Sequence, residues 1–542
     1  MRSFVAILAI LATMLSLSVG AEQPREAPRD SLEAEIARLL AEMPAGEGAE
    51  LQGFYAARDH RAAWVERQQV AAFAEALETL ESDGLDPRDY RADRLVAEHR
   101  RLQEANAAPA EQARFDLQTS TLLLSALRHL QRGRLDPRRV DPQWEIPVEP
   151  ARLDLEAVSR AVDGQRFEQA FGEARPAYVP YERLRNGLAR YRNIERVGGW
   201  PMLPEEPRVL REDDMDDVVA RLRQRLAMEG ELEVMAADPG AFPGAELETP
   251  DPRRFDGPLE AAVRRFQRRH LLEPDGIVGP QTRAALNVPV AVRIDQIRLN
   301  LERARWLLHG LPESFVLVDI AGYRLSYFRP GGEIWRSRIV VGRPYRRTPS
   351  LRSEITHMTV NPTWTVPPTI LREDVLPAIR RDPSYLQRQN MRVLSPSGQP
   401  LDPWRVDWYN PGNVMIRQEA GPRNALGQVV IRFPNDHLVY LHDTPAQGLF
   451  AREQRAFSSG CIRVQGVLEF AQLLLDDTGS DQSVQALTAS GQTRNVPLAS
   501  PMPVILHYWT VHPGEEGQLV FRPDIYERDG DLLRALNRPL AL

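Results

Sequence analysis

The one cysteine of the chain, Cys461, is the residue best suited to chemistry. It lies in residues 458–464, SSGCIRV, nineteen positions after His442. A thiol attacks a carbonyl as its thiolate, and free cysteine titrates near about 8.5, so an attacking cysteine needs a base or a cation beside it. Histidine is the usual base because its pKa lies near working pH. We therefore predict an acyl-transfer site with Cys461 as nucleophile and His442 as base. The structural alternative for Cys461 is a small buried hydrophobe.

The residues around this pair indicate how it is positioned. Residues 437–442, HLVYLH, predict a strand on which Leu438, Tyr440 and His442 share one face while His437 points to the other. Gly460, before the cysteine, lets backbone approach a substrate closely.

Two other histidines and one arginine complete the candidates. His357 and His437 are rivals to His442 as the base. Arg463 follows the nucleophile by two residues, where it would bind a substrate carboxylate or favour the thiolate. A structural salt bridge is the alternative role for Arg463.

Composition excludes several other chemistries. The chain has 542 residues with 68 basic and 75 acidic side chains, a net charge of −7, so no nucleic-acid partner is expected. Every basic residue counted is arginine, which excludes a lysine Schiff base, a Walker A lysine and the Ser-x-x-Lys motif. The sequence has no His-x-x-x-His pair, cysteine cluster or glycine-rich nucleotide loop, so we expect no metal and no cofactor.

The N-terminus predicts export. Arg2 precedes an apolar run over residues 4–19, and small residues follow at 19–21, so residues 1–21 are interpreted as a secretory signal peptide. A retained membrane anchor is the alternative. No second long apolar run follows, so we expect no transmembrane segment after cleavage.

The rest of the chain divides into three regions. Residues 22–245 have leucine and alanine at helical spacing and predict a helical scaffold domain. Residues 246–292 predict a compact helical unit with Leu259, Val263, Phe266 and His270 on one helix face. From residue 314 the segments become short, β-branched and aromatic, so residues 296–535 predict a mainly-β domain. Its irregular stretch at about 369–428 is a capping insertion or a surface elaboration.

Two of these regions resemble known families. The unit at 246–292 is similar to the peptidoglycan-binding domain 1 family through AVRRFQ at 262–267 and DGIVGPQT at 275–282. The resemblance implies a three-helix module that holds cell-wall glycan or peptide; a spacer that kept only its core residues is the alternative.

The mainly-β domain resembles the L,D-transpeptidase (YkuD) catalytic domain, and the whole chain resembles the long YcbB-type forms of Gram-negative bacteria. The matching motifs are VNPTWTVPP at 360–368, RFPN at 432–435, YLHDTP at 440–445 and SSGCIRV at 458–464. Ser459 stands where the wider family often has histidine. That departure matches the YcbB-type branch and removes one candidate base.

The resemblance implies a periplasmic, wall-associated enzyme. Cys461 would attack the carbonyl between diaminopimelate and the terminal D-Ala of a donor tetrapeptide. His442 would take the thiol proton and later activate an acceptor amine, oriented by the backbone carbonyl of Asp443. Amides of Gly460 and Cys461 would bind the oxyanion. The other expected substrate contacts are Arg463, Tyr440, Trp364 and Ser459, with aromatic core packing as the alternative for Tyr440 and Trp364.

The implied product is a 3→3 cross-link between stem peptides, and carbapenems would acylate Cys461. The expected partners are therefore peptidoglycan stem peptides and glycan, and the sequence names no protein partner. The alternatives are a thiol L,D-carboxypeptidase or endopeptidase, in which water accepts the acyl group, an enzyme that attaches a lipoprotein side chain to the wall, and a non-catalytic wall-binding scaffold.

Overall fold

The computed structural model describes residues 31–44, 48–205, 208–232, 251–514 and 517–540. The chain forms two compact units. The first comprises the described residues of Met1–Ala71 together with Arg94–Leu124 and Asp154–Gln165. The second comprises Ala72–Asp93, Ser125–Leu153 and the described residues of Arg166–Leu542. The predicted signal peptide at 1–21 and most of the expected linker before the second helical unit lie outside the described residues.

The first unit is helical. It contains α1 (Leu32–Ala41), α2 (Ala49–Ala56), most of α4 (Ala92–Glu104), α7 (Leu155–Asp163) and parts of α3 (Arg67–Glu78) and α5 (Pro109–Arg132). The buried carboxylate of Asp116 on α5 accepts hydrogen bonds from the Tyr55 hydroxyl (2.5 Å) and from the backbone amides of Ala63 (3.0 Å) and Trp64 (2.8 Å). These bonds satisfy the buried charge and join three parts of the unit.

The helical part of the second unit includes α13 (Val290–Leu307), which packs on α9 (Val179–Arg196). Its other elements are η1 (Thr79–Asp83), η2 (Pro87–Tyr90), α6 (Pro137–Val140), α8 (Phe167–Ala174) and α19 (Asp529–Leu536). Arg305 on α13 is fully buried and pairs with Glu302 at 2.5 Å. Its Nη1 also donates to the Asp83 carbonyl (2.8 Å) and to the Tyr181 hydroxyl (2.9 Å). Each of these groups therefore has a partner inside the protein.

Three helices form a small module with its own apolar core: α10 (Asp217–Met228), α11 (Gly257–Arg269) and α12 (Pro280–Leu286). Gln267 is buried and donates to the Asp275 carboxylate (2.8 Å) and the Thr282 hydroxyl (3.1 Å). It also accepts from the Gly276 amide (2.9 Å). These motif residues hold the module together. That is the role expected of them if the motif serves the fold of the module, the alternative to ligand binding that the sequence left open.

The main sheet closes on itself. Its strands follow the path β5–β10–β11–β13–β4–β3–β2–β14, and β14 pairs with β5 as well as with β2. The bounds are β2 (Phe315–Asp319), β3 (Arg324–Arg329), β4 (Gly332–Gly342), β5 (Ser350–Val360), β10 (Val429–Arg432), β11 (Leu441–His442), β13 (Ile462–Val464) and β14 (Arg494–His507). Closure leaves no free edge along this path.

Short elements complete the domain. They are β1 (Trp144–Glu145) beside β5, β12 (Ala456–Ser458) beside β4, the pair β15 (Val511–Pro513) and β16 (Leu519–Phe521), α17 (Val467–Asp477) and α18 (Val484–Ala489). Phe470 and Leu474 of α17 are fully buried in the sheet's apolar core. The apolar core therefore anchors α17, the helix that follows Cys461 and β13 in the chain.

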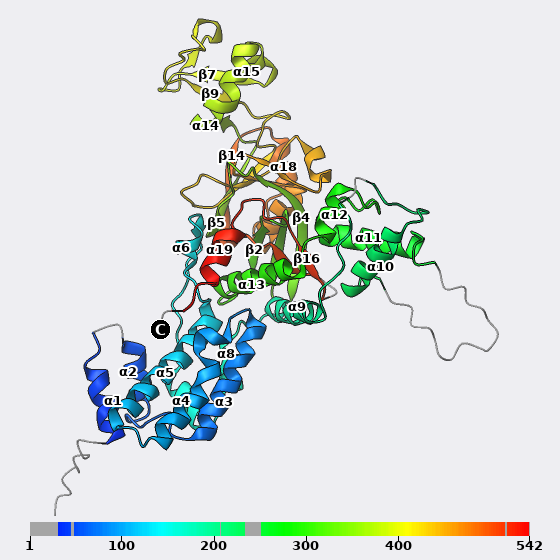
Figure 1. The fold of residues 1–542 in the computed structure, drawn as a ribbon. Coiled ribbons are helices and arrows are strands. Elements are labelled where there is room, and N and C mark those ends of the chain that lie inside the picture. Colours follow the sequence, from blue (N-terminus) through cyan, green and yellow to red (C-terminus); the bar gives the residue numbers. More distant parts are fainter. Residues whose placement is uncertain (1–30, 45–47, 206–207, 233–250, 515–516, 541–542) are drawn as a thin grey trace, which may run out of the picture. The chain divides into compact units, whose positions relative to one another are not determined.

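A lobe is inserted between β5 and β10, and Figure 1 draws it in yellow-green. Its strands follow the order β6 (Trp364–Thr365), β9 (Met415–Gln418), β7 (Met391–Leu394), β8 (Pro400–Leu401). Its helices are α14 (Pro368–Ile370), the π-helical turn η3 (Leu371–Val375), α15 (Leu376–Arg381) and α16 (Tyr385–Arg388), with the short turn η4 (Pro403–Arg405). It has an apolar core that includes Val366, Ile379 and Ile416. The lobe therefore has its own packing.

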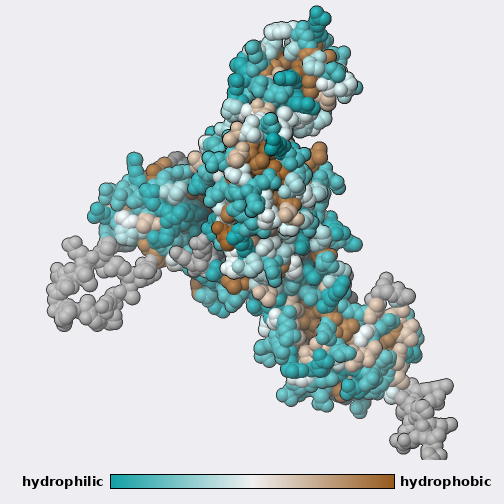
Figure 2. Space-filling model, turned by 180° about the vertical axis from the view of Figure 1, so that it is seen from behind, coloured by the Kyte–Doolittle hydropathy of each residue, from teal (hydrophilic) through white to brown (hydrophobic). Residues whose placement is uncertain are grey.

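The predicted fold class is confirmed: helical regions precede a mainly-β domain with an inserted segment. The prediction of a strand over 437–442 was wrong in extent, because β11 covers only Leu441–His442 and Leu438 has a left-handed backbone with φ 54°. In the described part of the chain, no helix is both long and apolar enough to cross a membrane. On the face seen in Figure 2, hydrophilic residues predominate and apolar residues lie between them in small groups.

Candidate active site

The register of two neighbouring strands brings the predicted nucleophile and base together. Strands β11 and β13 run parallel, with Leu441 opposite Ile462 and His442 opposite Arg463. The Ile462 amide donates to the Tyr440 carbonyl at 3.0 Å, which continues the register back to Tyr440 and Cys461. Because side chains alternate along strands, these pairs place Tyr440, His442, Cys461 and Arg463 on one face. Strand spacing puts the Cα atoms of Cys461 and His442 roughly 8 Å apart, a span that the two side chains can bridge.

His442 is fixed in one tautomer. Its Nδ1 donates to the backbone carbonyl of Asp443 at 2.5 Å, so the neutral ring has an unprotonated Nε2. Burial lowers the pKa of His442 to about 3, and the charge of Arg463 lowers it further, while the carbonyls of Asp443 and Leu426 oppose the shift. The lowered pKa keeps the imidazole neutral near neutral pH, and the carbonyl bonded to Nδ1 is the one that the family resemblance implies.

The surroundings of Cys461 favour the thiol over the thiolate. Its Sγ lies 3.8 Å from the carbonyl oxygen of Leu438. Burial raises the pKa of Cys461 to about 11, although the amide and hydroxyl of Tyr440 and then the charges of Arg463 and Arg432 act in the opposite direction. The resting pair is therefore a neutral thiol and a neutral imidazole, and Tyr440 touches the sulfur.

The turn before the cysteine is held by Ser458. Its hydroxyl donates to the Cys461 carbonyl (2.5 Å) and accepts from the Gly460 amide (3.1 Å). Gly460 has φ +115°, a conformation that side chains disfavour, so glycine is needed there. The Gly460 amide is thus engaged in this state. Of the two amides expected to bind an oxyanion, that of Cys461 is the one without a recorded acceptor.

Arg463 has no carboxylate partner among the described residues, and its Nε is buried without a hydrogen-bond partner. Burial lowers its pKa, the Cys461 thiol opposes this, and the charge of Arg343 adds to it. Arg432 also lies on this side: its guanidinium carbon is 5.2 Å from the centre of the Tyr440 ring. The thiol therefore faces positive charge that no protein carboxylate neutralises.

The other expected site residues have different positions. The Ser459 hydroxyl accepts a hydrogen bond from Arg346 at 2.7 Å. The Asp443 carboxylate accepts from the Gln428 amide at 2.9 Å, so it holds the chain that returns from the lobe. Trp364 packs against the core of the lobe, and the structure records no contact between it and Cys461.

The rival histidines have other partners. His437 Nε2 pairs with Glu145 at 2.6 Å. His357 Nδ1 bonds to the Thr356 hydroxyl at 2.9 Å. His357 shares the sheet face of His442, but β10 and β11 separate its strand from β13. His442 is the histidine on the strand that pairs directly with β13.

Sequence reasoning missed four residues that build this site: Leu438, Ser458, Thr348 and Arg346. Thr348 donates to the Gly460 carbonyl at 2.8 Å, and Arg346 contacts Ser459 from the same turn. Ser458 stood inside a quoted motif, so its spacing to Gly460 was the available signal. Arg346 and Thr348 lie more than a hundred positions from the cysteine, and no local pattern connects them to it.

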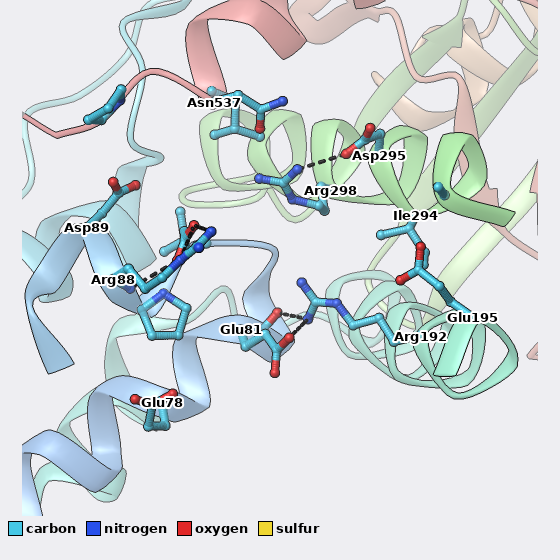
Figure 3. Close-up of a pocket in the computed structure, with 16 residues that line it drawn as sticks. Glu78, Glu81, Arg88, Asp89, Arg192, Glu195, Ile294, Asp295, Arg298 and Asn537 are labelled. Carbon is cyan, nitrogen blue, oxygen red and sulfur yellow. Dashed lines mark hydrogen bonds and ion pairs between the residues drawn. The ribbon is translucent and has the colours of Figure 1, made fainter. Parts of the chain in front are cut away.

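A separate cavity of about 950 Å³ lies in the helical part of the second unit (Figure 3). Charged residues dominate its lining, and several are paired with each other: Arg88 with Asp86 (2.7 Å), Arg298 with Asp295 (2.8 Å) and Arg192 with Glu81 (3.7 Å). The residues that line it include no cysteine or histidine. It therefore has no nucleophile–base pair, unlike the face that carries Cys461.

A metal centre does not fit the observed arrangement. Within the ranges that the structure describes, no group of three or more His, Cys, Asp or Glu side chains is arranged to hold a metal ion.

Three family models match the chain. Residues 313–488 match the L,D-transpeptidase catalytic domain (YkuD), residues 49–188 match a scaffold domain, and residues 236–286 match a "Putative peptidoglycan binding domain". A curated protein of Haemophilus influenzae named "Putative L,D-transpeptidase" is 39% identical over 218 residues, which are 40% of this chain and 44% of that protein. This chain thus spans less than half the length of that relative.

Solved structures with lower similarity include two L,D-transpeptidases. The enzyme from Mycobacterium smegmatis is 13% identical, with 36% of this chain and 58% of that chain covered and a TM-score of 0.18. The enzyme from Stackebrandtia nassauensis is 12% identical, with 57% and 96% covered and a TM-score of 0.21. The assignment of the domain rests on the family models and not on these structures.

Proposed function

We propose that this chain, which matches the L,D-transpeptidase catalytic domain (YkuD) at 313–488 and a peptidoglycan binding domain at 236–286, is a cysteine-dependent enzyme that forms 3→3 cross-links in peptidoglycan. The observation that carries the proposal is the strand register that puts Cys461 and His442 on one face, with His442 Nε2 free to accept a proton. Its substrates are the donor and acceptor stem peptides of the cell wall.

In the acylation step, Cys461 Sγ attacks the carbonyl between diaminopimelate and the terminal D-Ala. His442 Nε2 takes the thiol proton as the S–C bond forms, because both groups are neutral before attack. The imidazolium then gives that proton to the leaving amine, and D-Ala departs. The product is a thioester between Cys461 and the tripeptide.

In the transfer step, an acceptor amine attacks the thioester carbonyl. His442 takes a proton from the amine and returns one to the sulfur as the C–S bond breaks. The amide formed is the cross-link, and Cys461 is again a thiol. If water replaces the amine, the same steps release a tripeptide acid and the enzyme acts as an L,D-carboxypeptidase.

The positive charge beside the thiol supports a role for Arg463 in donor binding. An arginine with no protein carboxylate offers a bidentate site for a substrate carboxylate. Stem peptides carry free carboxylates near the bond that is cut. Arg463 would therefore orient the donor, and Tyr440 would donate its hydroxyl to the sulfur or to the developing oxyanion.

The location follows from the substrate. A donor and acceptor in peptidoglycan lie outside the cytoplasm, so we propose that the enzyme acts in the periplasm. Carbapenems, which the family resemblance implies as acylating agents, would form a thioester with Cys461.

The test is to incubate the enzyme with a disaccharide–tetrapeptide and to analyse the products by mass spectrometry, beside Cys461→Ala. A cross-linked dimer that has lost one D-Ala, absent with the variant, is the expected result. Tripeptide and free D-Ala without dimer would indicate the carboxypeptidase. No product with either protein would leave a non-catalytic wall-binding scaffold.

A further inference from the structure

The turn at residues 342–348 holds three successive residues of the nucleophile loop. The Arg343 amide donates to the Ser458 carbonyl (3.1 Å). Arg346 Nη1 donates to the Ser459 hydroxyl (2.7 Å), and the Thr348 hydroxyl donates to the Gly460 carbonyl (2.8 Å). Any displacement of this turn therefore reaches the residues immediately before Cys461.

The turn is itself fixed to the sheet. The Tyr526 hydroxyl donates to the Gly342 carbonyl (2.7 Å) and accepts from the Thr348 amide (3.1 Å). Tyr526 is fully buried in the apolar core. These two bonds hold both ends of the turn, and the side chain of Arg346 reaches from it to the nucleophile loop and to the lobe.

Arg346 also binds two carboxylates of the inserted lobe. Its Nη1 lies 2.6 Å from Asp374 Oδ2, and its Nη2 lies 2.7 Å from Glu373 Oε2. The Arg346 side chain is 10% exposed, whereas each carboxylate is 42% exposed. One guanidinium therefore connects the nucleophile loop to the lobe, from a position largely shielded from solvent.

The two carboxylates are adjacent on η3, the π-helical turn of the lobe. Such turns are rare and often occur at functional sites. In the part of the chain that the structure describes, we find no other ion pair between residues 364–423 and the sheet domain. The lobe has its own core, so this contact is a discrete link between two packed bodies.

We propose that Arg346 is a positioning residue that couples the lobe to the nucleophile loop and so favours an amine over water as acceptor of the acyl group. This inference rests on the proposed function. Glu373 and Asp374 hold η3 on the arginine that bonds to Ser459, two residues before Cys461, where the lobe would shield the thioester from water while an amine enters. Amine attack breaks the C–S bond to give an amide, and water attack breaks the same bond to give an acid, so shielding from water changes the product and not the acylation.

The test compares product ratios. The double variant E373Q/D374N removes both ion pairs with little change of shape and leaves the bond between Arg346 and Ser459. Glu419→Gln is the matched control, because it removes an ion pair with Arg392 (3.1 Å) that lies inside the lobe. Each protein is given disaccharide–tetrapeptide, and cross-linked dimer, tripeptide and the initial rate of D-Ala release are measured.

We expect the ratio of dimer to tripeptide to fall about tenfold in E373Q/D374N, as for loss of charge-assisted bonds. The rate of D-Ala release should stay within about threefold of wild type, and Glu419→Gln should match wild type in both. Added salt should lower the wild-type ratio toward that of the variant and leave the variant unchanged.

Three results would overturn the inference. The first is an unchanged ratio in E373Q/D374N. The second is a fall in D-Ala release as large as the fall in the ratio, which would assign the link to acylation. The third is a wild-type enzyme that yields tripeptide alone, which would also overturn the proposed 3→3 cross-linking while leaving acylation intact. A wild-type enzyme that releases no D-Ala would instead overturn the proposed function, and the inference with it.

Discussion

Arg305 and Arg463 are arginines of the same unit that the structure treats in opposite ways. Arg305 is fully buried on α13 and pairs with Glu302 at 2.5 Å, with further bonds to Asp83 and Tyr181. Arg463 lies beside the thiol and forms no ion pair with a carboxylate among the described residues, although the Nε atoms of both arginines are buried without a hydrogen-bond partner. A structural arginine has its carboxylate partner within the chain, whereas an arginine that binds a substrate carboxylate has no such partner until the substrate is bound.

The difference has an energetic meaning. A buried charge without a counter-charge costs free energy, so a chain that maintains one does so at the expense of stability. In the cavity of Figure 3, the arginines pair with neighbouring carboxylates, as Arg305 does. On the face of Cys461, by contrast, Arg463 forms no ion pair with a protein carboxylate in the part of the chain that the structure describes. Unpaired positive charge beside the Cys461 thiol therefore distinguishes the candidate active site from the cavity of Figure 3.

The largest effect is expected at Glu302. Glu302→Gln leaves Arg305 buried without a counter-charge, which should lower the free energy of unfolding by about 3–5 kcal/mol. Denaturant unfolding measures this, and activity per folded molecule should be unchanged at low temperature. A stability equal to wild type would show that Arg305 does not need Glu302 and would remove the contrast.

For Arg463 we expect the reverse, a large loss of activity without a loss of stability. Arg463→Gln should lower kcat/KM for the donor by about 30- to 1,000-fold, as for loss of about 2–4 kcal/mol of a desolvated charge pair. Its melting temperature should equal or exceed that of wild type, because an unpaired charge is removed. Steady-state kinetics and thermal unfolding on the same preparation measure both. A large loss of stability with unchanged kcat/KM would make Arg463 structural.

Arg463→Lys sharpens the comparison further. Lysine keeps the charge but lacks the planar fork that binds a carboxylate bidentately, so we expect a loss of about tenfold in kcat/KM, smaller than for glutamine. If lysine is as damaging as glutamine, geometry rather than charge is what the substrate requires. If lysine equals wild type, Arg463 acts only through its potential.

The smallest effect concerns pH. A thiolate at Cys461 would give Arg463 a counter-charge and weaken the contrast with Arg305. Because the pKa of Cys461 is raised to about 11 and that of His442 lowered to about 3, kcat/KM should vary less than about threefold between pH 5 and 9. Thiolate ultraviolet absorbance, with Cys461→Ser as blank, should rise only above about pH 9. A titration near neutrality would contradict this.

The same shifts fix the sign of the stability change with pH. The His442 pKa is depressed, so the unfolded chain binds a proton below about 6.5 while the folded chain does not. The contribution of neutral His442 is present above that pH and is lost as pH falls toward 3. The Cys461 pKa is raised, so its contribution is lost as pH rises above about 9 toward 11.

Sequence reasoning reached the fold class because hydrophobic periodicity separates the helical regions from the short strands. It also paired Cys461 with His442, because both lie in one short stretch of chain, and the parallel register places the two on one face of the sheet. It missed the left-handed backbone of Leu438, because six alternating residues resemble a strand whether or not they pair. The neutral state of the thiol was also hidden, since burial outweighs Arg463 only once the sheet has folded.

Long-range contacts explain the remaining omissions. Arg346 reaches Ser459 across more than a hundred residues, and its carboxylates come from a third segment. Separation along the sequence likewise conceals that Arg305 bonds to Tyr181 and that Arg463 has no carboxylate partner among the residues described. Whether an arginine is paired is a property of the folded chain, so composition and motifs alone do not distinguish the two kinds.

The measurement that tests the account most directly is the mass of the intact protein after rapid quenching with disaccharide–tetrapeptide. We predict an adduct equal to the donor minus D-Ala, mapped to the peptide that contains Cys461, formed by wild type and absent from Cys461→Ala. Cross-linked product formed without that adduct, or an adduct on another residue, would contradict a thioester at Cys461.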